Sequence, residues 1–149
     1  MSWGAAFRCA LLCMLTATHA AAEQLQSFGN WDIHYVVVPS TFLRPEIAHQ
    51  YSVVRAKNRS LVNISVLDKA GKATRGKIRG TTVNLLGQLQ ALEFREVAEA
   101  SAIYYLAEIE HDNEEMLRFR IAATIDGREL LVEFQQKLYW EDVDATRAR

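Results

Sequence analysis

Apolar and polar residues alternate along most of the chain after residue 23, and this period of two is typical of half-buried β-strands. The clearest case is residues 31–37, where every second side chain is apolar: Trp31, Ile33, Tyr35 and Val37. The opposite face of this segment carries Asp32 and His34. The pattern therefore predicts a strand that buries one face, and Pro39 is expected to end it.

One short helical turn is predicted after this strand. Pro45 precedes Glu46, Ile47 and Ala48, and proline suits the first position of a helix. Residues 51–55 and 61–67 form the next two predicted strands, and the polar residues 57–60 between them favour a turn. We expect these two strands to pair as a hairpin.

The pair Asp126-Gly127 predicts a second hairpin, because Asp-Gly is preferred in a two-residue type I′ turn. This turn places Phe119 opposite Phe134 on an apolar face. It also places Arg120 opposite Glu133 on the other face, where opposite charges stabilise a strand pair by about 0.2–1 kcal/mol. A shift of one residue would exchange the two faces, so the pattern specifies the register.

The same reasoning extends toward the N-terminus. A turn at Asp112-Asn113 places Tyr104 opposite Ile121 and gives a three-stranded meander. Tyr105 then lies across from Arg120 on the second face, which also carries apolar residues. That face is expected to be either a second packing surface or an exposed interaction surface.

Residues 85–102 allow two structures. Their many Leu, Gln, Ala and Glu residues favour a helix, whereas the partial alternation of residues 92–97 favours a strand. With a strand here, the sequence predicts an all-β fold: a two-sheet antiparallel β-sandwich, immunoglobulin-like in architecture, with one short helical turn. With a helix at 85–102, the alternative is an α+β fold in which that helix packs on an antiparallel sheet.

The first 22 residues have the pattern of a cleaved signal peptide. Arg8 provides a basic start, residues 10–15 are continuously apolar, and small residues follow at Ala20 and Ala22. Cleavage is expected after Ala22 or, alternatively, after Ala20. The apolar run is shorter than the roughly 20 residues that span a bilayer, so we expect no stable membrane insertion after cleavage. The remaining residues, 23–149, are predicted to form a single β-rich periplasmic domain.

The composition narrows the possible functions. Both cysteines, Cys9 and Cys13, lie in the predicted signal peptide, so the domain would contain no disulfide and no thiolate ligand. The chain has 17 Lys and Arg against 18 Asp and Glu; removal of Arg8 leaves 16 against 18, a net charge of −2. Such a balance argues against a nucleic-acid partner. The spacing of His34, His49 and His111 does not suit a metal site, and we expect no cofactor.

The sequence resembles a known family in several short elements. They include Ile33-His34-Tyr35, Pro45-Glu46-Ile47-Ala48 and, as the most specific, Asn63-Ile64-Ser65 after Arg55. The family comprises small exported proteins of Gram-negative bacteria known as domain of unknown function 4426. The resemblance implies a periplasmic location and a β-rich domain, and it brings no activity or catalytic residue with it.

Five residues are the candidates for a binding site: His34, Arg55, Asn63, Ser65 and Tyr105. Asn63 and Ser65 share a strand face that also carries leucines, so each needs a hydrogen-bond partner if it is buried, and Arg55 and Ser40 are the expected partners.

Two functional hypotheses follow from these observations. The first is a non-catalytic periplasmic binding or accessory module that recognises an envelope protein or ligand, since no sequence motif supplies a nucleophile or metal site. The alternative is a small periplasmic hydrolase or ligand-binding enzyme with a pocket near His34, Arg55 and Asn63, in which Asp32 would orient His34 as a base.

Overall fold

The computed structural model describes residues 24–142, which form nine strands, one short α-helix and one 3-10 helix. The strands are β1 (Gln24–Phe28), β2 (Trp31–Pro39), β3 (Arg59–Asp68), β4 (Lys77–Asn84), β5 (Leu89–Leu92), β6 (Arg95–Glu99), β7 (Ala102–Glu110), β8 (Glu115–Ile125) and β9 (Arg128–Leu138). The 3-10 helix η1 (Ser40–Phe42) and the helix α1 (Pro45–Gln50) lie between β2 and β3.

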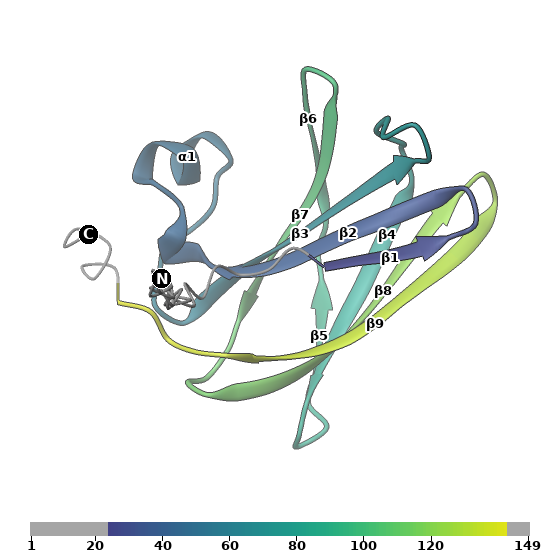
Figure 1. The fold of residues 1–149 in the computed structure, drawn as a ribbon. Coiled ribbons are helices and arrows are strands. Elements are labelled where there is room, and N and C mark those ends of the chain that lie inside the picture. The colour runs from purple at the N-terminus through teal and green to yellow at the C-terminus, as the bar shows by residue number, and fades with distance from the viewer. Residues whose placement is uncertain (1–23, 143–149) are drawn as a thin grey trace, which may run out of the picture.

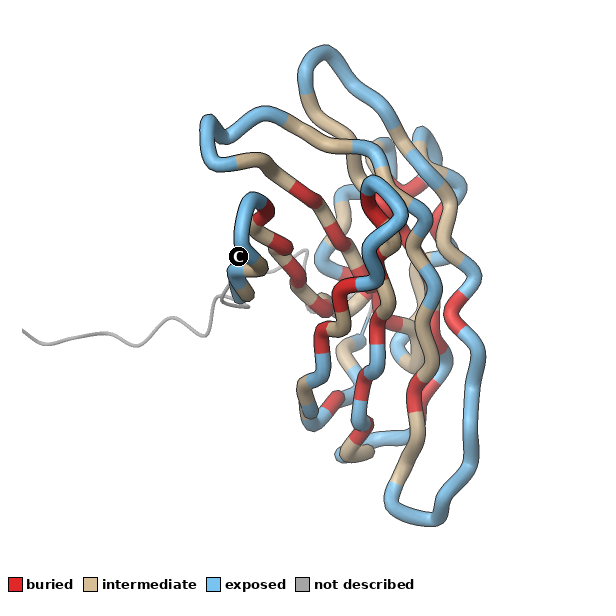
Figure 2. Tube along the Cα trace, turned by 90° about the vertical axis from the view of Figure 1, so that its right-hand side faces the viewer, coloured by how far each residue is buried: buried red, intermediate tan, exposed pale blue. Residues whose placement is uncertain are grey.

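These strands form two antiparallel sheets that pack face to face (Figure 1). Sheet A has five strands in the order β1-β2-β3-β7-β6, and sheet B has four in the order β5-β4-β8-β9. Along β2 and β8, buried positions alternate with intermediate or exposed ones, and the hairpin tips are exposed (Figure 2). The predicted two-sheet antiparallel sandwich with one short helical turn is therefore confirmed.

The core lies between the two sheets. As the alternation predicts, β2 buries Trp31, Ile33, Tyr35 and Val37. Sheet B supplies Phe119, whose ring stacks on that of Phe134 with centroids 4.6 Å apart, and Phe134 stacks in turn on Tyr35 at 4.5 Å. This row of three aromatic rings joins the two sheets.

The predicted β8–β9 hairpin is confirmed in register. Phe119 pairs with Phe134 and Arg120 pairs with Glu133. The turn residues Asp126 and Gly127 have φ angles of 49° and 73°, the positive values that a type I′ turn requires.

The predicted strand at residues 51–55 is wrong. Tyr51 caps α1, and Ser52 then adopts a φ of 54°, so the backbone turns instead of extending. The amide of Val53 bonds to the carbonyl of Ala48, and the amide of Val54 bonds to the Glu108 side chain. These bonds replace strand pairing, and β3 pairs with β2 and β7 instead.

The predicted three-stranded meander is also wrong, because β7 belongs to sheet A and β8 to sheet B. The reason is that β7 carries large apolar residues on both faces. Tyr105 faces the core, whereas Tyr104 and Leu106, which the sequence pattern assigned to the core, lie beneath the segment that contains α1. Residues 111–114 therefore cross between the sheets and do not form a tight hairpin.

The alternative helix at residues 85–102 is absent from the structure. The segment forms a hairpin tip, β5 and β6. Glu93 and Phe94 connect the two strands and carry the chain from sheet B to sheet A. Burial of Leu92 in the core outweighs the helix-favouring composition of this segment.

Candidate functional site

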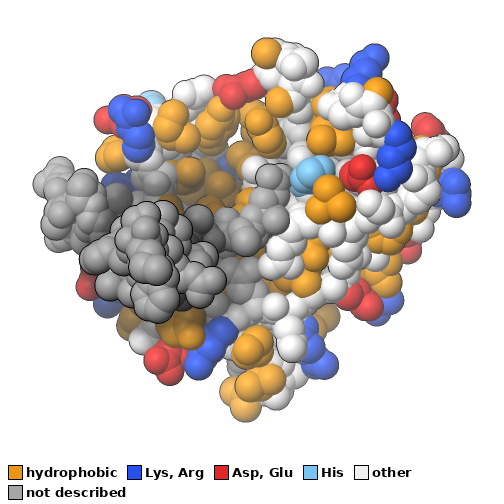
Figure 3. Space-filling view, viewed as in Figure 1, with side chains coloured by type: hydrophobic (Ala, Val, Ile, Leu, Met, Phe, Trp, Pro, Cys, Tyr) orange, Lys and Arg blue, Asp and Glu red, His pale blue; other side chains and the backbone are white. Residues whose placement is uncertain are grey.

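The hairpin between β4 and β5 exposes leucines at its tip. Leu85 is 79% exposed and Leu86 is 84% exposed, while Leu89 at the start of β5 is also largely in solvent. In Figure 3 hydrophobic side chains gather at the foot of the molecule, where Figure 1 draws this hairpin. Polar residues and glycine normally occupy such turns, so two leucines side by side are unusual.

The tip is held in one conformation by Asn84. Its Oδ1 accepts hydrogen bonds from the amides of Leu86 at 3.1 Å and Gln88 at 2.9 Å. Its Nδ2 donates to Gln88 Oε1 at 2.7 Å and to Glu115 Oε1 at 2.9 Å. Gly87, with a φ of 80°, donates its amide to the Asn84 carbonyl. The leucines therefore project from a fixed backbone.

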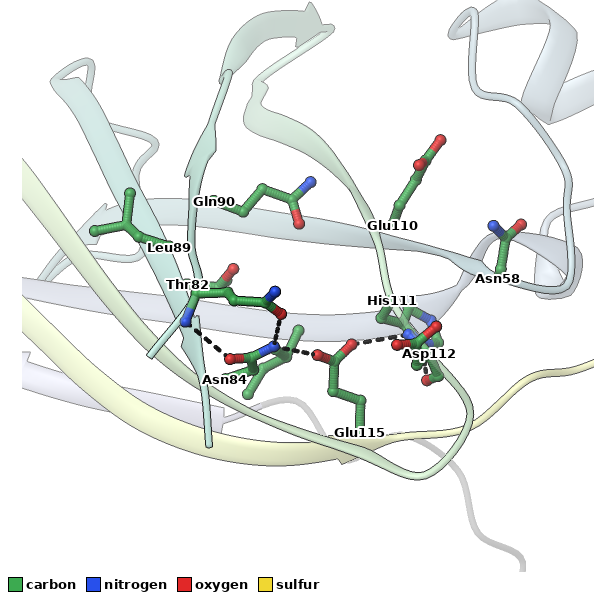
Figure 4. Close-up of a pocket in the computed structure, with 11 residues that line it drawn as sticks. Asn58, Thr82, Asn84, Leu89, Gln90, Glu110, His111, Asp112 and Glu115 are labelled. Carbon is green, nitrogen blue, oxygen red and sulfur yellow. Dashed lines mark hydrogen bonds between the residues drawn. The ribbon is translucent and has the colours of Figure 1, made fainter. Parts of the chain in front are cut away.

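Glu115 connects this hairpin to the crossover between β7 and β8 (Figure 4). While one carboxylate oxygen accepts from Asn84, the other accepts the amide hydrogen of Asp112 at 2.8 Å. These groups line a polar pocket of about 270 Å³ at the end of the sandwich, together with Thr82, Gln90 and other residues. The two loops consequently form one connected surface.

A buried Ser-His pair adjoins this pocket, and its histidine, His111, is one of the lining residues. His111 Nδ1 contacts the Asp112 carbonyl at 2.9 Å, so this nitrogen carries the hydrogen and donates it. His111 Nε2 is then the acceptor for the Ser60 hydroxyl at 3.0 Å. Ser60 is only 1% exposed and does not line the pocket, so its oxygen is not placed to attack a substrate. The pair joins β3 to the crossover.

The segment after β9 extends the same surface. The Trp140 amide donates to Asn113 Oδ1, and its indole Nε1 donates to the His111 carbonyl, both at 3.0 Å. Lys57 Nζ lies 4.7 Å from the centre of the Trp140 ring. Tyr139 and Trp140 are both partly exposed. We call the surface formed by residues 84–89, 111–115 and 139–140 the loop end.

Acidic side chains surround the exposed leucines. Asp112, Glu114 and Glu115 line a hollow of about 240 Å³ together with Leu85 and Leu86. Lys137 Nζ lies 3.9 Å from Glu114, but both side chains are exposed and such pairs are weak. The loop end thus combines an apolar tip with an acidic rim.

Three of the five predicted site residues share the outer face of sheet A. His34 pairs directly with Ser65, and Asn63 lies two residues from Ser65 on the same face of β3. Of these three residues, Asn63 lines a groove beside α1. The predicted hydrogen-bond partners of Asn63 are engaged elsewhere: Ser40 Oγ bonds to the backbone of Ala56, and Arg55 Nη2 bonds to the Thr41 carbonyl.

Tyr105 lies on the opposite side of the sheet and does not join His34, Asn63 and Ser65. It faces the core, its hydroxyl accepts a hydrogen bond from the Gly76 amide at 2.9 Å, and burial raises the pKa of its hydroxyl. Asp32, which was expected to orient His34, bonds to Lys69 Nζ at 2.6 Å and Ser27 Oγ at 2.5 Å. These two bonds lower the pKa of Asp32.

Sequence reasoning missed the loop end. The Asn84-Leu85-Leu86-Gly87 run contains a usable signal, because Asn and Gly flank the leucines in the manner of a turn. The Ser60–His111 pair had no such signal, since 51 positions separate its members.

In residues 24–142 no cluster of three His, Cys, Asp or Glu side chains is arranged to hold a metal ion. No helix within those residues is long and apolar enough to cross a membrane.

Comparison with known proteins identifies the family. The sequence model described as "Domain of unknown function (DUF4426)" matches residues 25–141. The chain belongs to the DUF4426 family. A crystal structure of a DUF4426 family protein from Pseudomonas aeruginosa PAO1 is 34% identical, with a TM-score of 0.73 over 80% of this chain and 97% of that one. No curated protein matches the sequence.

More distant structures share the fold alone. FetP from uropathogenic Escherichia coli strain F11, recombinantly expressed in the periplasm, is 12% identical. Its TM-score is 0.57, over 81% of this DUF4426 chain and 96% of FetP. A copper-bound FetP variant is 11% identical with a TM-score of 0.58, over 79% and 95% of the two chains. At this identity the likeness extends to the sandwich and not to a ligand.

The groove beside α1 yields a test of the local electrostatics. A hydrogen bond to the Glu99 carboxylate, assisted by partial burial, raises the pKa of the Tyr51 hydroxyl. Glu99→Gln removes the negative charge that opposes ionisation, so we expect the Tyr51 pKa to fall toward its ordinary value. Ultraviolet titration of tyrosinate, compared between the two proteins, measures the change. Glu46→Gln, on the exposed side of α1, is the control, and an equal fall there would contradict this assignment.

Proposed function

We propose that this DUF4426 protein is a non-catalytic periplasmic module that binds an envelope protein through its loop end. The observation that carries the proposal is the exposed pair Leu85 and Leu86 on a hairpin fixed by Asn84. Exposed apolar patches rimmed by polar residues are typical of interaction sites. A tip that is already ordered also loses little conformational entropy on binding.

The chemistry of the loop end indicates the kind of partner. Leu85 and Leu86 would insert into an apolar pocket, and the acidic rim of Asp112, Glu114 and Glu115 favours basic residues around that pocket. The same acidic groups would be repelled by an anionic lipid surface. These charges therefore favour a protein partner over a membrane.

The periplasmic location rests on three supporting observations. Residues 1–22 have the pattern of a cleaved signal peptide, although they lie outside the described residues. The family resemblance implies an exported protein. FetP, which shares the fold, was expressed in the periplasm.

Site-specific crosslinking in cells tests the proposal. The full-length chain is expressed in a Gram-negative host and recovered from the periplasmic fraction, where we expect it to begin at Glu23 or, after the alternative cleavage, at Ala21. A photoreactive amino acid at position 86 is expected to form a covalent adduct with one envelope protein. The same group at Lys72, in the loop at the other end of β4, is the matched control and should not form it.

Binding measurements with the purified partner then test the chemistry. Leu85→Ser/Leu86→Ser should weaken binding at least tenfold, whereas Leu25→Ser/Val54→Ser, which also replaces two exposed aliphatic residues, should leave it unchanged. Higher salt should weaken binding because the rim is charged. Adducts with lipid alone, adducts no stronger at position 86 than at 72, or equal affinity of the two double variants would overturn the proposal.

A further inference from the structure

The segment from η1 to residue 56 covers part of the outer face of sheet A (Figure 1). Side-chain bonds fix it there: Arg95 Nη2 donates to the Tyr51 carbonyl, and Glu108 accepts the Val54 amide hydrogen at 2.8 Å. At the C-terminal end of α1, Gln50 Nε2 donates a hydrogen bond to Glu99 Oε1 at 3.0 Å. The segment is therefore anchored at several points along its length.

A groove of about 270 Å³ runs between α1 and the sheet. In Figure 3 it is the hollow lined with hydrophobic side chains between the positions of α1 and β6 in Figure 1. Ile47 of α1 forms one side, and Leu61, Leu106 and Tyr104 of the sheet form the floor. The groove is largely apolar, so it would accommodate an apolar molecular chain.

One polar group on the floor has no partner among the described residues. The Asn63 Oδ1 atom is buried and accepts no hydrogen bond there. An unsatisfied buried acceptor costs roughly 1–3 kcal/mol. Rotation of the side-chain amide by about 180° exchanges the positions of its oxygen and nitrogen. Asn63 therefore offers either a donor or an acceptor to a molecule in the groove, and an occupant with a hydroxyl would satisfy it.

The charge at the other end of the groove is negative. Among the described residues that line it, Glu99 alone is charged. Asn63 pairs with Leu106, Leu106 with Arg95, and Glu99 follows Arg95 by four residues. Two strand spacings and four residues separate Asn63 from Glu99, which corresponds to roughly 16 Å between their Cα atoms.

We propose that the groove binds a small amphiphilic amine. Its protonated amino group lies against Glu99, its apolar chain of about six carbons lies over Leu106 and Tyr104, and a terminal hydroxyl bonds to Asn63. Tyr51 and Tyr104 add aromatic faces that attract a cation. This site is separate from the loop end and does not depend on the proposed protein partner.

Amide chemical-shift mapping of the mature chain with three probes tests the inference. We expect 6-aminohexan-1-ol to shift the amides of residues around the groove and to bind at least fivefold more tightly than hexylamine, which lacks the hydroxyl. Hexanoate, whose charge is reversed, should produce no saturable shift there. Absence of a saturable response to 6-aminohexan-1-ol, a response centred elsewhere, or an equal response to hexanoate would overturn the inference.

Variants separate the two polar contacts. Glu99→Gln should weaken binding of both amines at least fivefold, whereas Glu46→Gln on the outer side of α1 should not. Asn63→Leu should abolish the preference for 6-aminohexan-1-ol over hexylamine and leave the hexylamine affinity in place. Leu85→Ser/Leu86→Ser should bind the amines normally, which keeps this test independent of the loop end. An unchanged affinity in Glu99→Gln would contradict the proposed orientation.

Discussion

Phe119→Ala is expected to destabilise the domain by about 3–5 kcal/mol, the usual cost of removing a buried phenylalanine ring. Phe119 is buried between the sheets and stacks on Phe134, which in turn stacks on Tyr35 of the other sheet. Alanine leaves a cavity and removes one ring of this row. Urea unfolding of the mature chain measures the loss, which is a large part of the roughly 5–15 kcal/mol that holds a typical domain.

Phe42→Ala provides the matched control for Phe119→Ala. Phe42 belongs to η1 and has about half of its surface in solvent, so the same substitution should change the free energy of unfolding by less than about 1 kcal/mol. The denaturant slope should also stay constant in both variants. Similar losses in the two variants would show that the aromatic row is not a centre of stability.

The β8–β9 hairpin could be predicted in detail because its information is local. Asp126 and Gly127 tolerate positive φ, and the apolar residues on either side select one register. The single turn of helix beginning at Pro45 could be predicted for the same reason. Such features depend on residues close together in the chain, where turn chemistry and alternation act directly.

The placement of β7 could not be predicted in this way. Both of its faces carry large apolar residues, so alternation does not distinguish the side that meets sheet B from the side covered by α1. Tyr105 lies on the first side, whereas Tyr104 and Leu106 lie on the second. The choice depends on contacts with β3 and with the segment that contains α1, both distant in sequence, and a single-sequence pattern does not contain that information.

The candidate sites also divide into features that nearby residues determine and features that distant contacts determine. Asn63 could be selected from the sequence because a polar residue among leucines on a strand requires a partner, and the structure places it in a groove. Its selected companions Arg55 and Ser40 bond elsewhere, since the segment around η1 folds on itself. The exposed leucines Leu85 and Leu86 were not selected from the sequence, because the composition of residues 85–102 favours a helix. In the structure, Asn84 and Gly87 form a turn there.

Asn84→Ala is expected to release the leucine-bearing hairpin while leaving the sandwich folded. Alanine removes two bonds to backbone amides and two to side chains, at a cost of about 1–2 kcal/mol. Hydrogen exchange of the Leu86 and Gln88 backbone amides should accelerate about tenfold, because these two amides donate their hydrogen bonds to Asn84 Oδ1. Exchange in the β8–β9 hairpin should change little. Faster exchange throughout the domain, with no excess at these two amides, would contradict a local role.

The same variant distinguishes apolar area from preorganisation at the loop end. Asn84→Ala retains Leu85 and Leu86, so a partner that needs only their apolar surface would bind as before. A partner that needs the fixed tip would bind about threefold to tenfold more weakly, since the hairpin must be ordered on binding. Gln88→Ala, which removes the side-chain bond to Asn84 Nδ2 but keeps both amide bonds to its Oδ1, should have the smaller effect. An equal loss in the two variants would show that the amide bonds do not determine the conformation that binds.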